Sequence, residues 1–482
     1  MRPGAASAMR ALGALLLAAP LALSARDLPR TVLDALAAAG VPASAVAIKV
    51  EPADGGPAVL SHQERAAFNP ASVMKLVTSY AALDLLGPAF TFRTDALLAG
   101  ELHDGVLAGD LVLRGGGDPK LTYERMWRMA HRLRARGLRE IRGDVVVDRG
   151  YFAPLPAEPR AFDAEPRRAY NVAPDALLVN FGAVDFTFVP AGEAVRVLAE
   201  PDLPNVQVTS RIHAVPGPCG AWRHGLHYDV QATGLLATVA FAGDYPLECG
   251  ERAWPLAVFD DARFFESVFR WVWSEAGGKL TGKVRDGPTP AGARLFDREE
   301  SEPLASLIRD MNKFSNNVMA RHLFLALSAE RTAGNGSAAE SARIVREWLA
   351  AKGIDAPELV LENGSGLSRD ERLSAATLAA LLKSAWASGS MPDLAASLPI
   401  FAVDGTLGSR PASGSAGRAH LKGGTLTGVQ SLAGYVLDRS GRRWIVVMLV
   451  NHRNANAAQP AFDALVDWVG RRGTAREAGG KR

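Results

Sequence analysis

The chain has 482 residues, of which 48% are hydrophobic and 22% charged, and its net charge is +3. These values are typical of a globular protein, and the length predicts two or three domains. The low net charge gives no basis for predicting nucleic-acid binding, because nucleic-acid-binding proteins gather Lys and Arg on one face or in tracts. The short basic tail at 476–482 is expected to be a solvated terminus.

The first 25 residues have the pattern of a secretory signal peptide. Arg2 and Arg10 precede an apolar run at 11–23, and the small residues Ser24 and Ala25 follow it. A short membrane anchor is the alternative, but the run has about 13 residues, fewer than the roughly 20 needed to span a bilayer. We therefore expect a cleaved signal peptide at 1–25 and a mature protein that works outside the cytoplasm.

The chain has two cysteines, Cys219 and Cys249, which lie in one region. An oxidising compartment permits a disulfide between them, and we expect one; two buried free thiols are the alternative. The nine histidines show no metal-ligand spacing such as HxxxH or HExxH, so neither a metal site nor a cofactor is predicted.

Composition and periodicity divide the mature chain into three parts. Residues 26–90 and 293–475 are expected to form one helix-rich unit that ends in an antiparallel sheet. Residues 91–292 contain short strands and many Pro and Gly turns, which predicts a mostly β or α+β insertion into that unit.

Individual elements follow from the spacing of apolar residues and from turn signals. Helices are expected at 27–40, 72–86, 123–136, 304–312, 316–329, 337–352, 374–387 and 459–469. Strands are expected at 45–50, 111–114, 144–148, 195–199, 420–426, 430–437 and 443–451.

Ser72 and Lys75 form an S-x-x-K motif at the start of a predicted helix. Residues i and i+3 of a helix share a face, so the hydroxyl and the amine can lie within hydrogen-bond reach. A serine nucleophile needs a base, and a lysine with a lowered pKa can be that base. Backbone N–H groups at the helix start can also stabilise an oxyanion. Such a motif also arises by chance, and an N-capping serine beside a surface lysine is the alternative.

A second motif, Ser315-Asn316-Asn317, lies at a junction between two predicted helices. The hydroxyl of Ser315 can relay a proton, and the amide of Asn317 can hold a peptide carbonyl. A polar helix cap is the alternative interpretation.

A third motif, Lys422-Gly423-Gly424, lies on a predicted strand and is followed by Thr425. A lysine there can bind a carboxylate, and the glycines allow a substrate backbone to approach the strand edge. A glycine bulge in a hairpin is the alternative.

The order of these three motifs resembles that of the penicillin-binding proteins and serine β-lactamases. The first two motifs are too far apart for a class A β-lactamase. The spacing resembles that of the class C low-molecular-mass penicillin-binding proteins, the D-alanyl-D-alanine carboxypeptidase/endopeptidases of the periplasm. Further segments that resemble this family lie at 115–119, 170–174, 363–369 and 404–407.

The resemblance implies an α/β (α+β) fold of the penicillin-binding/β-lactamase-like transpeptidase type, with helices around an antiparallel sheet. A large, mostly β region is expected between the first and second motifs. The implied partners are peptidoglycan stem peptides and, as covalent inhibitors, β-lactams, with no nucleic acid and no metal. The implied location is the periplasm, and the oligomeric state stays open, a homodimer included.

The resemblance also implies a role for each motif residue. Ser72 would attack the carbonyl between two D-alanines, and Lys75 would accept its proton. Ser315 and Lys422 would deliver a proton to the leaving amine, and Asn317 would hold the substrate amide. The implied substrate-binding residues are Gly423, Gly424 and Thr425, and the N–H groups of Ser72 and Thr425 would form the oxyanion hole.

Gly423 departs from the family pattern, in which Thr or Ser occupies this position. A hydroxyl that would bind the terminal carboxylate of the substrate is therefore missing. Thr425 lies two residues further along the strand, hence on the same face, and is the expected substitute. Alternatively, the missing hydroxyl favours endopeptidase action on cross-links over removal of a terminal D-alanine.

Some questions stay open at the level of sequence. In the insertion, Asp163 or Glu165 could contact the free amino group of the stem peptide, and solvated loop carboxylates are the alternative. A β-lactamase is a competing function, although no extra acid for positioning water is recognisable. A catalytically weak protein that binds cell-wall peptide is another, and Gly423 is its support.

Overall fold

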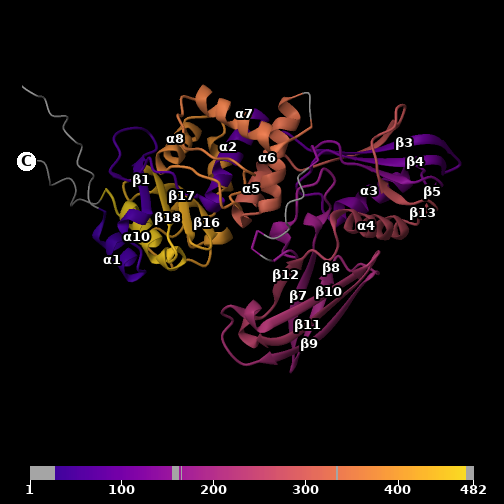
Figure 1. The fold of residues 1–482 in the computed structure, drawn as a ribbon, viewed down its shortest axis with the longest axis horizontal. Helices are drawn as coiled ribbons and strands as arrows, with labels where there is room; N and C mark the ends of the chain where they lie inside the picture. The colour runs from indigo at the N-terminus through magenta and orange to yellow at the C-terminus, as the bar shows by residue number, and fades with distance from the viewer. Residues whose placement is uncertain (1–27, 155–161, 164, 333–334, 474–482) are drawn as a thin grey trace, which may run out of the picture.

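The computed structural model describes residues 28–154, 162–163, 165–332 and 335–473 (Figure 1). The expected signal peptide at 1–25 and tail at 476–482 lie outside these residues. Among the described residues, no helix combines the length and the apolar character that crossing a bilayer requires.

Strands from both ends of the chain form one five-stranded antiparallel sheet. Its order is β16-β17-β18-β1-β2, and β1 pairs with β18 along its whole length. Figure 1 accordingly places the indigo N-terminal and yellow C-terminal segments side by side. The strand bounds are β1 (Val46–Pro52), β2 (Leu60–His62), β16 (Ala419–Leu426), β17 (Val429–Leu437) and β18 (Arg443–Asn451).

Both faces of this sheet are covered by helices, so its central strands are apolar throughout. On β18, Ile445, Val447 and Leu449 pack into one core, whereas the alternating Val446, Met448 and Val450 pack into another. This is the two-residue period of a strand that is buried on both faces. The second core also contains α1 (Arg30–Ala38) and α10 (Gln459–Gly470).

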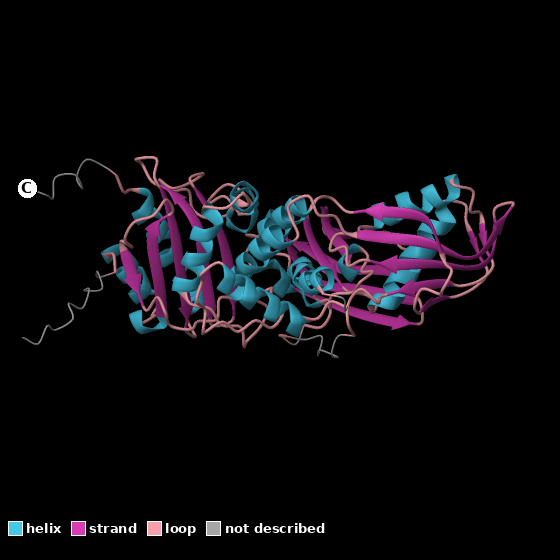
Figure 2. Ribbon diagram, turned by 90° about the horizontal axis from the view of Figure 1, so that it is seen from above, coloured by secondary structure: helices cyan, strands magenta, loops and turns pink. Residues whose placement is uncertain are grey.

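The first core is shared with a group of helices that lies between the sheet and the rest of the molecule (Figure 2). This group positions the candidate site, because three of its helices begin or end at the sequence motifs: α2, α5 and α6. Its members are α2 (Lys75–Leu85), α5 (Leu304–Phe314), α6 (Asn317–Arg331), α7 (Ala338–Ala351), α8 (Ala375–Trp386) and α9 (Met391–Ser397).

The insertion forms two further sheets around a shared apolar core with two helices, α3 (Tyr123–Ala135) and α4 (Asp261–Glu275). The first sheet has seven strands, with the order β13-β5-β4-β3-β15 and with β6 pairing with β4 and β14. Its strands are β3 (Arg93–His103), β4 (Val106–Gly115), β5 (Glu140–Ile141), β6 (Val145–Asp148), β13 (Lys279–Leu280), β14 (Val284–Asp286) and β15 (Arg294–Glu300).

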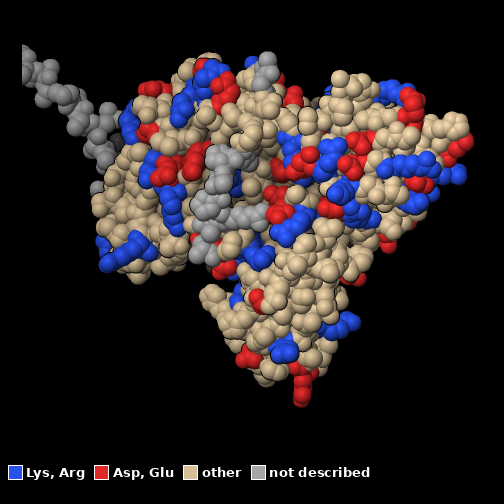
Figure 3. Space-filling model, turned by 45° about the vertical axis from the view of Figure 1, so that its right-hand side comes forward, with Lys and Arg blue, Asp and Glu red and all other residues tan. Residues whose placement is uncertain are grey.

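The second inserted sheet has six strands in the order β10-β11-β9-β8-β7-β12. Cys219 and Cys249 are joined by a disulfide beside this sheet, with their Cα atoms 4.5 Å apart. Figure 3 shows that charged side chains are sparse on the lobe that this sheet forms. The strand bounds are β7 (Val184–Ala191), β8 (Ala194–Glu200), β9 (Val206–Val215), β10 (Leu226–Thr233), β11 (Leu236–Pro246) and β12 (Arg252–Leu256).

The end of the insertion differs from the sequence expectation. β15 pairs with β3 and therefore belongs to the first inserted sheet, although it lies beyond residue 292. We therefore propose Glu300 as the end of the inserted region, since the next element, α5, packs in the helical core.

Candidate active site

Ser72 lies in a short 3-10 turn, Ala71–Met74, immediately before α2. The expected helix at 72–86 therefore begins with this turn, and its α-helical part starts at Lys75. The backbone is tightly packed here: a Cβ on Gly366 would lie 1.9 Å from the carbonyl oxygen of Ala71. A Cβ on Gly424 of β16 would lie 2.7 Å from the amide nitrogen of Ser72. These two glycines allow a loop and a strand to approach the candidate nucleophile from both sides.

Lys75 is fully buried and its amine contacts three oxygen atoms. Nζ lies 3.1 Å from Ser72 Oγ, 2.6 Å from Asn317 Oδ1 and 2.5 Å from the carbonyl oxygen of Ser365. A neutral amine has two hydrogens and one lone pair. Because the two carbonyl-type oxygens can only accept hydrogen bonds, they take both hydrogens, and the lone pair is directed at the hydroxyl of Ser72.

The environment of Lys75 favours the neutral amine that this arrangement requires. Burial lowers its pKa well below the ordinary lysine value, and the positive charge of Lys422 lowers it further. The carboxylate of Glu371 opposes both effects. The pair of Ser72 and Lys75 is thus arranged as a hydroxyl next to a potential base.

Ser315 and Lys422 form a second hydrogen-bonded pair at the site. Ser315 caps the end of α5 in the left-handed conformation, with φ 56°, and Lys422 Nζ donates to its Oγ at 2.8 Å. Nζ also donates to the carbonyl oxygen of Gly423 at 2.7 Å. Burial lowers the pKa of Lys422 to about 7, so the lysine can gain or lose its proton near neutral pH.

A cavity of about 220 Å³ opens along β16 beside Ser72. Gly423, Gly424 and Thr425 all line it. Thr406 lines it too and lies in the segment at 404–407 that resembles the family. Three further polar lining residues carry no signal in the sequence: Arg410, Gln430 and Ser431.

Two residues at the base of the site were also missed as site residues. The segment at 363–369 was recognised as a family motif, but the sequence gave no indication that the carbonyl of Ser365 binds Lys75. Glu371 is fully buried and its Oε1 accepts N–H bonds from residues 362, 363 and 364. In the sequence, Glu371 looks like an ordinary charged loop residue, and nothing indicates that it is buried.

The two acidic residues suggested in the insertion are already engaged within the protein. Asp163 accepts hydrogen bonds from the hydroxyl of Tyr170 and the amide of Asn171. Glu165 forms an ion pair with Arg168 at 3.3 Å. These contacts give both carboxylates a local structural partner.

Comparison with known proteins shows the family of this chain. Residues 30–472 match the model of the D-Ala-D-Ala carboxypeptidase 3 (S13) family. The chain belongs to this family. The D-alanyl-D-alanine carboxypeptidase of Actinomadura sp. is 30% identical over 406 residues, which cover 81% of this chain and 74% of that protein. The D-alanyl-D-alanine carboxypeptidase DacB of Haemophilus influenzae is 25% identical over 394 residues, covering 79% and 80%.

The fold is also that of a solved structure. Penicillin binding protein 4 of Haemophilus influenzae aligns with a TM-score of 0.73 and 22% identity, covering 90% of this chain and 99% of that one. The family resemblance and the fold class expected from the sequence are thereby confirmed. Family membership identifies the chain as a D-Ala-D-Ala carboxypeptidase-type enzyme.

Proposed function

We propose that the enzyme hydrolyses peptidoglycan stem peptides or their cross-links through an acyl-enzyme on Ser72. The observation that carries this proposal is the contact set of Lys75. Its two oxygen acceptors leave the lone pair of a neutral amine directed at the hydroxyl of Ser72. No other buried lysine among the described residues has a serine hydroxyl and two carbonyl-type acceptors around its amine.

In the first half-reaction, Ser72 Oγ forms a bond to the carbonyl carbon of the penultimate D-alanine while its proton passes to Lys75. The N–H groups of Ser72 and Thr425 stabilise the oxyanion. The carbon–nitrogen bond then breaks, and the leaving amine takes this proton, which is relayed from Lys75 through Ser315 and Lys422, so that Lys75 is neutral again. In the second half-reaction, water attacks the ester carbonyl and passes a proton to Lys75. The ester carbon–oxygen bond then breaks, Lys75 returns the proton to Ser72 Oγ, and the peptide leaves as a carboxylic acid.

The leaving group is a free D-alanine in the carboxypeptidase reaction and a second stem peptide in the endopeptidase reaction. In this proposal the carboxylate of the leaving group binds in the cavity along β16, near Lys422. Peptidoglycan lies outside the cytoplasm, so we also propose that the enzyme works in the periplasm after export.

Labelling with a fluorescent penicillin tests the acyl-enzyme. We expect wild-type protein to become labelled and Ser72→Ala to stay unlabelled. An unlabelled wild-type protein would overturn the proposal. Labelled protein should also release D-alanine from a pentapeptide or cleave a cross-linked muropeptide, and failure at both would favour a binding protein without peptidase activity.

A further inference from the structure

A second cavity, of about 280 Å³, adjoins the candidate active site. On one side it is lined by residues 314–318, which include Ser315 and Asn317 of the second motif. On the other side it is lined by residues of the insertion. A peptide held at Asn317 can therefore extend directly into this cavity.

Two arginines of the insertion flank one tryptophan in this cavity. The guanidinium carbon of Arg168 lies 4.7 Å from the ring centroid of Trp254, and that of Arg223 lies 5.7 Å from it. Burial lowers the pKa of Arg223, and the positive charge of Arg168 lowers it further. Two cations thus share one aromatic side chain, with Arg168 half-buried and Arg223 exposed.

The two arginines differ in whether a carboxylate lies close enough to form an ion pair with them. Arg168 is paired with Glu165. Arg223 has no carboxylate within 4 Å in the described part of the chain, and its guanidinium donates only to the carbonyl of Ala253, at 3.3 Å. Arg223 is exposed to solvent, so its guanidinium can form charged hydrogen bonds with a bound anion.

The acidic group that lines the cavity is Asp185 of β7. Burial raises its pKa, and the neighbouring Glu200 raises it further, so both effects favour its neutral form. Asp185 is itself exposed, so solvent weakens its repulsion of an incoming carboxylate.

We propose that this cavity is a subsite for a carboxylate of the peptidoglycan peptide, with Arg223 as its principal ligand. The inference rests on the proposed peptidase function. A guanidinium binds a carboxylate through two parallel N–H bonds. Phe314, which is 70% exposed, offers apolar surface to the carbon chain that bears this carboxylate. The carboxylate belongs either to the strand that acylates Ser72 or to the strand that leaves.

The test compares Arg223→Met, which keeps an unbranched apolar stem, with Arg223→Lys and with the control Arg211→Met. Arg211 is exposed on β9 and lies outside the lining of the cavity. The substrates are an uncross-linked pentapeptide and a cross-linked muropeptide dimer, each with free or amidated side-chain carboxylates. Fluorescent penicillin, which lacks the peptide, reports whether Ser72 is intact.

We expect Arg223→Met to lower kcat/KM about tenfold for the substrate with free carboxylates, as for loss of a charged hydrogen bond. The amidated substrate should be cleaved equally by Arg223→Met and wild type, and Arg223→Lys should recover part of the loss. A loss confined to the dimer assigns the carboxylate to the leaving strand, whereas a loss on both substrates assigns it to the acylating strand.

Equal behaviour of Arg223→Met and Arg211→Met would overturn the subsite, as would an equal loss on free and amidated substrates. A loss of penicillin labelling in Arg223→Met would also overturn it, because Arg223 would then support the fold. Failure of the wild type to react with penicillin would instead contradict the proposed acyl-enzyme on Ser72.

Discussion

At the scale of single residues, the site depends on the lowered pKa of a buried lysine and on two glycines whose lack of a side chain leaves room beside Ser72. Burial and the charge of Lys422 lower the pKa of Lys75, which favours the neutral amine, while the carboxylate of Glu371 raises it. Gly424 allows β16 to approach Ser72, whereas a Cβ at Gly423 would make only an ordinary contact with Leu407. Each of these statements predicts the result of a substitution.

Gly423→Thr should be tolerated and should favour the carboxypeptidase reaction. A Cβ at this position meets only Leu407 Cδ2, at 3.6 Å, which is an ordinary contact. The added hydroxyl can donate to the terminal carboxylate, and we expect kcat/KM for release of D-alanine from a pentapeptide to rise about tenfold. Gly424→Thr is the matched control and should abolish penicillin labelling, because its Cβ would lie 2.4 Å from Ser431 Oγ. An unchanged ratio of carboxypeptidase to endopeptidase activity in Gly423→Thr would contradict this role for residue 423.

Glu371→Gln should move the acid limb of the pH profile. The carboxylate raises the pKa of Lys75, so its removal lowers that pKa, and the neutral base persists to lower pH. Gln keeps an oxygen that can accept the N–H groups of residues 362–364, whereas Ala does not. The measurement is the penicillin acylation rate against pH for Glu371→Gln and Glu371→Ala. A fall in rate without any shift of the acid limb in Glu371→Gln would mean that Glu371 only supports the loop.

The alkaline limb of the same profile should report Lys422. This lysine must be charged to attract a carboxylate, and burial lowers its pKa to about 7, so the rate should decline as the pH rises through about 7. In Lys422→Arg the guanidinium stays charged, and we expect the alkaline limb to move to higher pH. An identical alkaline limb in both proteins would assign that ionisation to another group.

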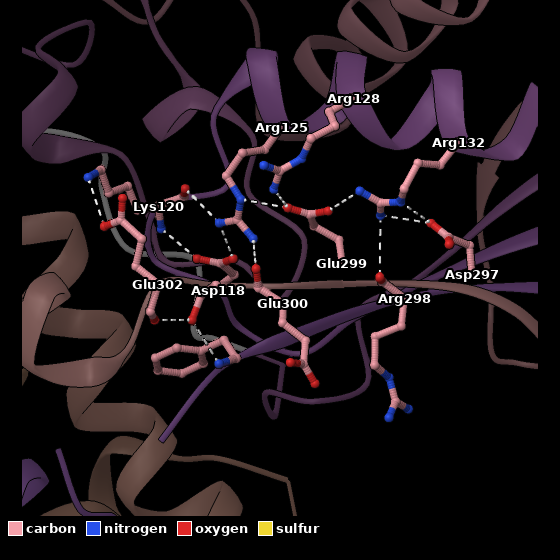
Figure 4. A network of polar contacts seen from close by, with 12 residues as sticks. Asp118, Lys120, Arg125, Arg128, Arg132, Asp297, Arg298, Glu299, Glu300 and Glu302 are labelled. Carbon is pink, nitrogen blue, oxygen red and sulfur yellow. Dashed lines mark hydrogen bonds and ion pairs between the residues drawn. The ribbon is translucent and has the colours of Figure 1, made fainter. Parts of the chain in front are cut away.

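At the scale of elements, a network of ion pairs holds α3 against β15 (Figure 4). Glu299 is buried and accepts hydrogen bonds from Arg125, Arg128 and Arg132, which follow one face of α3. Burial raises the pKa of Glu299, but these hydrogen bonds outweigh that effect and lower it. The stabilisation is therefore present above the ordinary glutamate pKa and is lost as the pH falls through the lowered value.

Glu299→Gln should destabilise the inserted sheet by about 3–5 kcal/mol, because three guanidiniums lose a buried partner. Chemical denaturation followed by tryptophan fluorescence at pH 7 measures this loss. Glu340→Gln, at an exposed pair with Arg343, is the control and should leave the transition almost unchanged. Equal transitions for the two variants would show that the network adds nothing beyond a surface pair.

The elements of the catalytic unit could be predicted from the sequence, and those of the insertion only in part. The helices at 304–312 and 374–387 and the strand at 443–451 are found close to their expected bounds, because apolar spacing and capping signals are strong there. Among the elements not expected were α4 and β9–β11. Residues of β10 and β11 do alternate between the two faces, as in a strand with one polar face, but the small Ala, Gly and Thr residues among them dilute the apolar signal.

The part of the candidate site that could be predicted consists of side chains that belong to short sequence motifs. Ser72, Lys75, Ser315, Asn317 and Lys422 are brought together by the fold at hydrogen-bond distances. The carbonyl of Ser365, the carboxylate of Glu371 and the cavity residues act through tertiary contacts between distant segments. Such contacts leave no local signal in a single sequence.

At the scale of the whole molecule, the insertion does more than enlarge the protein, because it completes the second cavity beside the catalytic unit. The disulfide between Cys219 and Cys249 lies close in sequence to Trp222 and Arg223. The two aromatic rings of Trp222 and Trp254 are 5.7 Å apart, and Arg223 lies over both. The disulfide is thus placed to hold Arg223 at the cavity.

Replacing both cysteines by serine should therefore affect the lobe of the second inserted sheet and leave the catalytic unit intact. The bridge closes a loop with a sequence separation of 30, and its loss should lower the stability of the lobe by about 3–4 kcal/mol. Penicillin labelling of Ser72 should persist, because the catalytic unit has its own core. Discrimination between free and amidated peptides should fall as in Arg223→Met. Full discrimination in the serine variant, measured below its first thermal transition, would show that packing against Trp254 alone positions Arg223.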